Sequence, residues 1–419
     1  ILYNLLNMEV ITDKSAVITF AIAGFFLLIV IEYFYGLFVG KNTYRLNDTL
    51  TSVGIGMISR FPVMLNLGVQ SVIFVYISSY LSLELLSAKN PLTWIVAFLL
   101  YDLSYYWMHR MHHEIKILWA THSVHHHGEE FNLSTALRQT STGWLWKWIF
   151  YMPMIMLGVP GEVFVTVAGV NLVYQFWVHT KHIGHLGFLE KIFITPMNHG
   201  IHHAKNKEYI DANYGGVFII WDRMFGTYIA EKPDIKPVYG TATPLGSWNP
   251  IWANFQVLSI MVKDTIKTKS WKDKVKVWFS KTYWRPEDCI EEKNPNDFYK
   301  KFNPEISPDV KLFGIIQMFF ITVVPYTVLF FASLHSYFEI VLFGISVITL
   351  ATLSGHLMQG NRSMYQMVLI FSVLGLFGIN YYDLLNLELI STKLLNVQLS
   401  INILLITGIF FFQSLTNIK

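Results

Sequence analysis

Long apolar stretches recur along the chain and predict helices that cross a membrane. A bilayer core about 30 Å thick is crossed by about 20 helical residues, because each residue adds about 1.5 Å. Stretches of this kind cover residues 15–40, 50–86, 91–108, 144–157, 162–178, 312–334, 336–354, 364–380 and 396–415. The pattern therefore predicts an all-α, polytopic membrane protein of about nine transmembrane helices.

Particular residues interrupt this pattern. Arg60 and Pro62 lie inside the second stretch, which we expect to be tilted or broken there because proline cannot continue the hydrogen bonds of a helix. The sequence Gly158-Val159-Pro160-Gly161 separates the fourth and fifth stretches and predicts a tight reversal. Glu32 is an acidic residue within the first stretch.

Basic residues set the expected orientation. A polar segment after the fifth stretch carries Lys263, Lys267, Lys269, Lys272, Lys274, Lys276, Lys281 and Arg285. Lysine and arginine concentrate in the cytosolic flanks of membrane helices. We therefore expect this segment to be cytosolic, together with the ends of the third and fifth stretches at His109 and His179.

Composition supports a membrane protein and excludes other classes. The chain is 53% hydrophobic and 14% charged, whereas about 25% of the residues of a soluble domain are charged. The formal net charge of +3 is too small to indicate a nucleic-acid partner. Cys289 is the single cysteine of the sequence, so an internal disulfide is excluded.

Histidine is concentrated in the middle of the chain, where thirteen of the fifteen lie between His109 and His203. They form the clusters His-Arg-Met-His-His from His109, His-Ser-Val-His-His from His122 and His-Gly-Ile-His-His from His199, and His179 closes the fifth stretch. Residues three and four apart share one face of a helix. The spacing therefore predicts stripes of imidazoles on one side of the membrane.

These stripes indicate metal binding. Imidazole is a ligand for iron, zinc, copper and nickel. A single zinc ion takes three or four protein ligands, so about nine histidines favour a di-metal site in a cytosolic cap. Neutral histidines do not offset the charge of a divalent ion, so carboxylates are expected to accept hydrogen bonds from the outer ring nitrogens. Asp102, Glu114 and Asp222 are the candidate catalytic carboxylates for that role.

The series HxxxH, HxxHH, HxxHH on a multi-span chain resembles the fatty acid hydroxylase and sterol desaturase superfamily of membrane di-iron enzymes. Within it, residues 109–228 are similar to the alkylglycerol monooxygenase family. The residues that carry this resemblance are His109-Arg110, His113-Glu114, Leu118-Trp119-Ala120, Asn132-Leu133, residues 135–139, residues 174–180, Asn213-Tyr214, Ile220-Trp221-Asp222 and Phe225-Gly226-Thr227. Lys181 and His182 follow, where the family pattern leads us to expect an acidic residue.

The resemblance implies a set of ligands and cofactors. The metal ligands would be His109, His113, His122, His125, His126, His179, His199, His202 and His203, with Glu114 near the metals. Two iron ions would work with O₂, and zinc is the alternative metal. The external electron donor would be tetrahydrobiopterin, another reduced pterin or a redox protein.

The distribution of apolar stretches, histidines and basic residues predicts a division of the chain into four parts. Residues 1–90 would form N-terminal transmembrane helices and residues 91–230 the histidine-rich catalytic region. Residues 231–311 would form a cytosolic basic segment and residues 312–419 a C-terminal region of four transmembrane helices.

The implied reaction is hydroxylation of a lipid C–H bond. Attack beside the ether oxygen of an alkylglycerol gives a hemiacetal, which collapses to a fatty aldehyde and a glycerol derivative. Asn132, Arg138 and Lys205 are candidate contacts for the lipid head group. A fatty acyl or sterol hydroxylase or desaturase is the alternative. A non-enzymatic transporter is less favoured, because transporters place polar residues near the bilayer midplane and these histidines lie at the ends of predicted spans.

Overall fold

The computed structural model describes residues 8–65, 76–290 and 298–416, and within these ranges the protein is all-α, as predicted, with two isolated β-bridges in place of strands. The longer helices are α2 (Met8–Phe38), α3 (Leu46–Ile58), α6 (Pro91–Glu114), α7 (Lys116–His126), α8 (Trp148–Met156), α9 (Gly161–Trp177), α12 (Pro250–Lys267), α13 (Trp271–Phe279), α14 (Pro308–Phe330), α15 (Tyr337–Leu357), α16 (Met364–Tyr381) and α17 (Ile390–Thr416). The short elements near the histidines are α4 (Phe61–Met64), η1 (Leu133–Leu137), η2 (Gly143–Leu145), η3 (Gly187–Lys191), α10 (Pro196–His202) and α11 (Ile220–Phe225).

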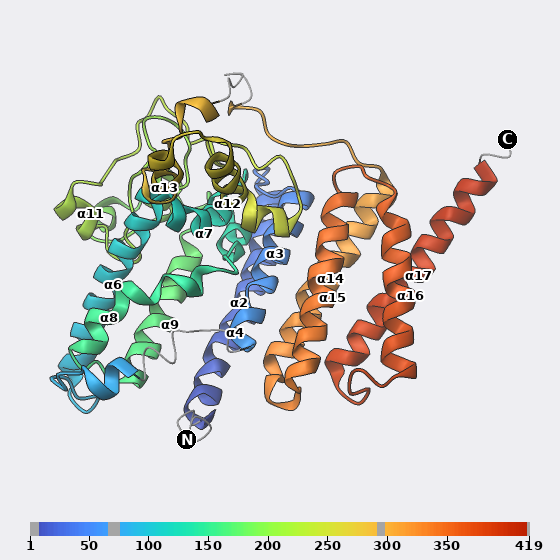
Figure 1. Ribbon diagram of the computed structural model, residues 1–419, viewed down its shortest axis with the longest axis horizontal. Coiled ribbons are helices and arrows are strands. Elements are labelled where there is room, and N and C mark those ends of the chain that lie inside the picture. Colours follow the sequence, from blue (N-terminus) through green and yellow to red (C-terminus); the bar gives the residue numbers. More distant parts are fainter. Residues whose placement is uncertain (1–7, 66–75, 291–297, 417–419) are drawn as a thin grey trace.

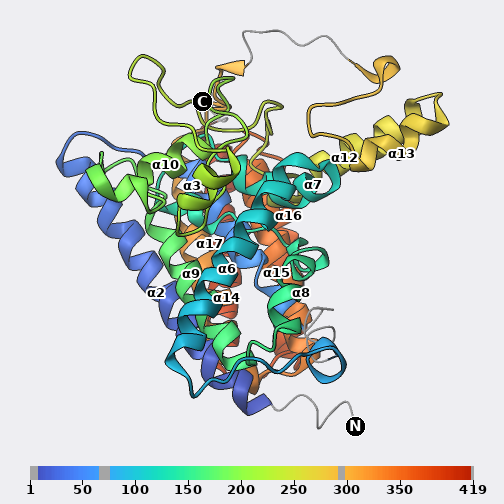
Figure 2. The ribbon, with the colours of Figure 1, turned by 90° about the vertical axis from the view of Figure 1, so that its left-hand side faces the viewer.

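The long helices lie side by side in three groups (Figure 1). On one side stand α6, α8 and α9, on the other side stand α14 to α17, and α2 and α3 lie between them. The helices α7, α10, α12 and α13 gather beyond one end of the long helices and form a cap (Figure 2). The histidine-bearing end of α6 therefore reaches the histidine-bearing helices α7 and α10 within this cap.

Within the described residues, five helices are long and apolar enough to cross a membrane. They are Phe20–Phe38 within α2, the whole of α14, α15 and α16, and Ile390–Phe411 within α17. These helices correspond to the first and the last four stretches that the hydropathy pattern indicated. Of the other stretches, 162–178 forms the 17-residue α9, and 144–157 contains only the 9-residue α8, which is too short to cross a bilayer core.

Both predicted interruptions are present. The helix α3 ends at Ile58 and α4 begins at Phe61, where Pro62 stands in the first turn of the new helix. Part of the second stretch, residues 66–75, lies outside the described residues. The reversal between α8 and α9 contains Gly158 with φ of +88°, and a Cβ there would lie 2.7 Å from the Cα of Glu84. Glycine is required at this position for conformation and for space.

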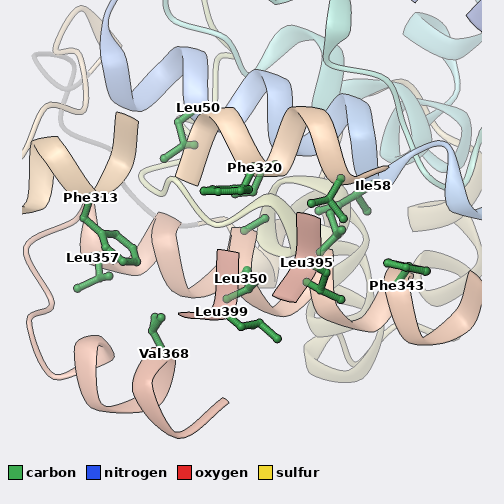
Figure 3. Packing of buried hydrophobic residues seen from close by; sticks show 14 of the residues in the cluster. Leu50, Ile58, Phe313, Phe320, Phe343, Leu350, Leu357, Val368, Leu395 and Leu399 are labelled. Atoms are coloured by element: carbon green, nitrogen blue, oxygen red, sulfur yellow. The ribbon is translucent and has the colours of Figure 1, made fainter. Parts of the chain in front are cut away.

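A large apolar cluster joins α3 to the C-terminal helices. Leu50 and Ile58 of α3 pack with Phe313 and Phe320 of α14 and with Leu350 of α15 (Figure 3). Between membrane helices such packing stabilises through close van der Waals contact, because lipid tails are as apolar as the side chains. The helix α3 is buried from Asn47 to Ile58 and so links the C-terminal helices to the histidine-bearing part.

Gly56 allows α3 to touch η1. A Cβ at this position would lie 2.6 Å from the carbonyl oxygen of Leu137, so the backbone of η1 would have to move. We expect Gly56→Ala to lower the stability by about 1–3 kcal/mol, measured as a lower Tm of the purified protein. The control is Gly24→Ala, because a Cβ on Gly24 meets no atom within 4 Å. An unchanged Tm for Gly56→Ala would contradict the close packing of α3 on η1.

Candidate metal centre

Nine histidines meet in the cap and form two adjacent groups. The five-histidine group contains His109, His113, His122, His126 and His202, and the four-histidine group contains His125, His179, His199 and His203. Within each group the candidate ligand nitrogens lie within 4.8 Å of one another, and all nine side chains are buried. The ring centroids of His126 and His203, one from each group, are 4.4 Å apart. The structure thus brings together the nine histidines that the family resemblance indicated.

Each HxxHH cluster contributes to both groups. On α7, His122 and His126 belong to the five-histidine group, whereas His125 belongs to the four-histidine group. The third cluster reverses this pattern, because His199 and His203 join the four-histidine group and His202 joins the other. The spacing predicted one stripe per helix. In the structure each stripe lies between the two groups and serves both.

Local sequence places these helices. The side chain of Thr195 caps α10 by accepting a hydrogen bond from the Asn198 amide, and Pro196 occupies the first helical position. The residue Ile115 is extended and separates α6 from α7, so that the chain turns between the first two clusters. His179 follows the last turn of α9. The histidines are therefore fixed by helix ends rather than by long loops.

Backbone carbonyls orient four of the rings. The contacts are His109 Nδ1 to Tyr214 O at 2.8 Å, His202 Nδ1 to Ala212 O at 2.9 Å, His125 Nδ1 to Arg138 O at 3.1 Å and His179 Nδ1 to Gln175 O at 2.8 Å. A carbonyl only accepts, so each Nδ1 carries the proton. A neutral imidazole has one N–H, and the Nε2 atom of each of these rings therefore presents a lone pair.

The Nε2 atoms approach one another at distances that fit a bound cation. The Nε2 atoms of His125 and His179 are 3.3 Å apart, although both present lone pairs. Two facing lone pairs repel unless a cation accepts both of them. Ligand nitrogens about 2.1 Å from an ion and at right angles around it are about 3 Å apart. The donor sets of both groups therefore fit metal ions and, together with their adjacency, are consistent with a di-metal site.

Burial keeps these imidazoles neutral. It lowers the pKa of His202 to about 4 and the pKa of His179 to about 3. For His122 and His203, burial and the neighbouring rings lower the pKa well below its usual range. The lone pairs are consequently available for a metal at pH 7, since protonation does not compete.

Asp102 and Asp222 hold the loop that supports the His109 ring. Asp102 accepts hydrogen bonds from the amides of Val217 at 2.8 Å and Phe218 at 3.0 Å, and from the side chains of Asn171 and Trp221. Asp222 accepts from the amides of Tyr214 at 2.7 Å and Gly215 at 2.8 Å. The expectation that these carboxylates accept directly from ligand rings is wrong. Backbone carbonyls do so, and the two aspartates position one of them.

Glu114 lies at the edge of the site. It accepts hydrogen bonds from Arg110 Nε at 2.7 Å and from the ammonium of Lys281, and its side chain is 23% exposed. The carboxylate near His113 is that of Asp211, whose Oδ1 lies 3.9 Å from the His113 Nδ1 atom. No spacing in the sequence singled out Asp211, because it belongs to an irregular segment with φ of +62°.

Glu32 supports the four-histidine group from α2, a role that the sequence analysis missed. Its carboxylate accepts hydrogen bonds from the Leu133 amide at 2.8 Å and from the hydroxyls of Thr180 and Tyr44. Thr180 directly follows His179. The family pattern predicts an acidic residue after Thr180, where this sequence has Lys181 and His182. The structure supplies the acid from another helix. The signal was available, because an ionisable residue inside a membrane span is by default a functional candidate.

The three candidate head-group residues contact other residues of the protein. Asn132 caps η1 and donates to the carbonyl of Thr43 at 2.7 Å. Arg138 is 1% exposed and donates to the Val124 carbonyl and to the Ser52 hydroxyl. The Lys205 ammonium lies 4.9 Å from the Phe298 ring centre. These contacts stabilise the cap, and none of the three residues lines the cavity described next.

A mainly apolar cavity of about 420 Å³ reaches the histidines from the side of the long helices. His122, His125 and His179 form part of its wall. The rest is built largely from α2, α6, α8 and α9, and the stacked rings of Phe25 and Phe176, 3.9 Å apart, close one side. The cavity offers a path by which an alkyl chain reaches both histidine groups without crossing the polar cap.

Comparison with known proteins defines the class to which this site belongs. Residues 94–227 match the family model for fatty acid hydroxylase, and this range contains all nine histidines. The matched range agrees with the superfamily resemblance that the histidine spacing indicated.

The curated relatives narrow the resemblance to alkylglycerol monooxygenases. The chain is 39% identical to the human alkylglycerol monooxygenase over 283 residues, which are 66% of this chain and 63% of that protein. It is 39% identical to the one from Xenopus tropicalis over 262 residues, 62% of this chain and 58% of the relative. An ornithine lipid hydroxylase from Rhizobium tropici is 30% identical over 142 residues, 32% of this chain and 41% of that protein.

The alkylglycerol monooxygenases are thus homologues of this chain, and its match spans less than two thirds of the length of each. No solved structure matches the chain significantly.

Proposed function

We propose that this protein is a membrane di-iron monooxygenase that oxidises a lipid C–H bond and cleaves the ether bond of alkylglycerols. The observation that carries the proposal is the pair of adjacent histidine groups at the end of an apolar cavity. Homology to alkylglycerol monooxygenases supports the ether-lipid substrate, and the match to the fatty acid hydroxylase family supports the reaction class.

The two histidine groups would hold one iron ion each. Iron supplies the activation of O₂ that no side chain provides. The ligands would be the nine histidines, and zinc is the other metal that imidazole sets of this kind accept. The Nδ1 contacts to backbone carbonyls would keep each Nε2 atom directed at its ion, as partners of metal-bound histidines do in general.

The overall reaction balances with an external two-electron donor. One oxygen atom of O₂ enters the C–H bond beside the ether oxygen, and the other leaves as water with two protons. The donor is a reduced pterin such as tetrahydrobiopterin, or a redox protein. The resulting hemiacetal breaks its C–O bond to release a fatty aldehyde and a glycerol derivative. The cavity wall would exclude bulk water while the C–H bond is attacked.

We also propose the topology and domain division that the sequence indicated. The nine predicted stretches would lie in the membrane, with the 9-residue α8 entering it only in part, and the cap would face the cytosol, with divisions at residues 90, 230 and 311. The basic residues of α12 and α13 support this orientation. On α13, Trp271, Val275 and Phe279 are four residues apart and exposed, which suits a helix lying on the lipid surface.

An assay for aldehyde tests the proposed reaction. Purified protein loaded with ferrous iron and given 1-O-hexadecylglycerol, tetrahydrobiopterin and O₂ is expected to yield hexadecanal and glycerol in equal amounts. The product is expected to disappear without O₂ or without the reductant, because both enter the balanced reaction. Failure to release aldehyde under full conditions, with metal bound, would overturn the ether-lipid assignment.

A hydroxylase or desaturase acting on a fatty acyl or sterol substrate is the second candidate. The similarity to an ornithine lipid hydroxylase and to a fungal sterol desaturase, the latter at 26% identity over 151 residues, favours it over unrelated classes. O₂-dependent oxidation of such a lipid, without aldehyde from the ether lipid, would select this alternative. A transporter is disfavoured because the histidine groups lie at one end of α6 and in the cap that follows it, rather than in the middle of the long helices.

A further inference from the structure

Two positively charged side chains line the same cavity as the histidines. Arg60 follows α3 and Lys147 precedes α8, and both belong to the cavity wall together with His122, His125 and His179. The described lining residues include no aspartate or glutamate. The wall therefore carries positive charge and no opposite charge.

Neither cation forms an ion pair within the part of the chain that the structure describes. The Nε and Nη2 atoms of Arg60 donate to the uncharged Ser59 hydroxyl at 3.2 and 3.0 Å. The Lys147 side chain shares the cavity with Arg60 and His125, and the two positive charges repel each other.

Two unpaired positive charges in one cavity destabilise the folded protein unless an anion binds to them. Arg60 and Lys147 are partly buried, and a charge in a mainly apolar cavity is costly when it has no partner. Two like charges in one cavity add repulsion. Elsewhere the protein pairs such groups, as it does for Arg285, whose Nη2 lies 2.6 Å from the Asp264 carboxylate. Polar side chains of Gln139 and Thr140 also line the cavity and add hydrogen-bonding groups.

We propose that Arg60 and Lys147 form a binding site for an anionic group, a phosphate or a carboxylate, carried by the lipid that enters this cavity. The alkyl chain would lie against the apolar residues of α2 and α9, such as Ile22, Phe25 and Leu172. The proposal rests on the proposed function and adds that, among ether lipids, those with an acidic head group bind more tightly than neutral alkylglycerols.

The position of the site also restricts where the lipid is oxidised. The cations share their cavity with His122, His125 and His179, so the bonds nearest the head group face the metal centre. Oxidation would fall on carbons close to the acidic group, and the far end of the chain would remain unmodified.

Equilibrium binding without turnover tests this site. The probes are hexadecyl phosphate, hexadecanoate and hexadecanol, titrated into the full-length protein in an uncharged detergent under anaerobic conditions. We expect at least one of the two anions to bind about tenfold to a hundredfold more tightly than the alcohol, as one or two charge-assisted contacts provide. The tighter of the two anions identifies whether the site prefers phosphate or carboxylate.

Variants assign the preference to the two cations. Lys147→Met and Arg60→Met are each expected to reduce the preference for the anion at least about tenfold, and Lys147→Arg to retain it. Lys207→Met is the matched control, because Lys207 is an exposed lysine of the cap, and it is expected to retain the full preference. Equal affinity of the parent for all three probes, or an unchanged preference in both methionine variants, would overturn the proposal.

Thermal stability separates this role from a structural one. Without lipid, Lys147→Met is expected to melt at the same temperature as the parent or higher, because the variant removes an unpaired cation and its repulsion from Arg60. A large fall in Tm would show that Lys147 supports the fold and would contradict the assignment to a ligand. Because binding is measured without O₂ or reductant, loss of ether cleavage alone would count against the proposed reaction and leave the anion site standing.

Discussion

Replacing His125 with alanine is expected to reduce the metal content of the purified protein from about two ions per chain to about one. His125 belongs to the four-histidine group, which would keep only three ligands, whereas the five-histidine group would remain complete. Ether-lipid oxidation is expected to fall more than a hundredfold. Removal of a residue that only hydrogen-bonds to a metal ligand costs about tenfold to a hundredfold, and His125 is a candidate ligand itself. Elemental analysis and the aldehyde assay measure the two quantities.

Two further variants make this result specific. His202→Ala removes a member of the five-histidine group and is expected to lower metal content and activity as well. His185→Ala is the control, since this histidine is 63% exposed, pairs with Glu190 and belongs to neither group. Iron at about two ions per chain in the parent would support the di-iron assignment. Equal metal content in the parent, His125→Ala and His202→Ala would show that the groups are not a metal centre.

Replacing Asp102 with alanine is expected to produce the largest loss of stability among the variants considered. Its carboxylate is fully buried and accepts four hydrogen bonds, from the Val217 and Phe218 amides and from the Asn171 and Trp221 side chains. Truncation leaves these donors unpaired, which costs about 4 kcal/mol at about 1 kcal/mol for each donor. The Tm of the metal-free protein, measured by thermal denaturation, reports this loss.

The same substitution is expected to weaken metal binding at a distance. The loop that Asp102 holds also carries the carbonyl of Tyr214, which orients the His109 ring. Asp102→Asn keeps one acceptor and is expected to fall between the parent and alanine in both Tm and metal content. Glu208→Ala, at an exposed position, is the control. A Tm for Asp102→Ala equal to that of the parent would contradict the inference that Asp102 holds the loop that contains Val217 and Phe218.

Helix type and the nine histidines that cluster in the cap were accessible from the sequence and the family resemblance. Apolar length is a one-dimensional property, and so α2 and α14 to α17 were predicted close to their observed positions. The break near Pro62 and the reversal at Gly158 followed from backbone chemistry that these residues impose locally. Histidine spacing and the family resemblance together indicated the nine residues that the fold assembles.

The hydrogen-bond partners of the candidate site residues were harder to predict from the sequence. Asp102 and Asp222 were singled out as carboxylates near the site, but two amides that donate to Asp102, those of Val217 and Phe218, lie more than a hundred residues further along the chain. Asn132 and Arg138 look like head-group contacts when only their polar side chains and their position in the motif are considered. Their hydrogen bonds to Thr43 and Val124 show that they support the fold.

The sequence by itself determined that this protein is a helical membrane protein with a histidine-rich centre of the fatty acid hydroxylase type, because hydropathy and ligand spacing are local. Only the tertiary structure decided how the histidines divide into five and four, since adjacent residues of α7 and α10 face different groups. It also decided that Glu32 supplies the acid beside Thr180, and that Arg60 and Lys147 share a cavity. Such pairings depend on how helices pack, and no spacing along the chain records a contact between segments brought together by folding.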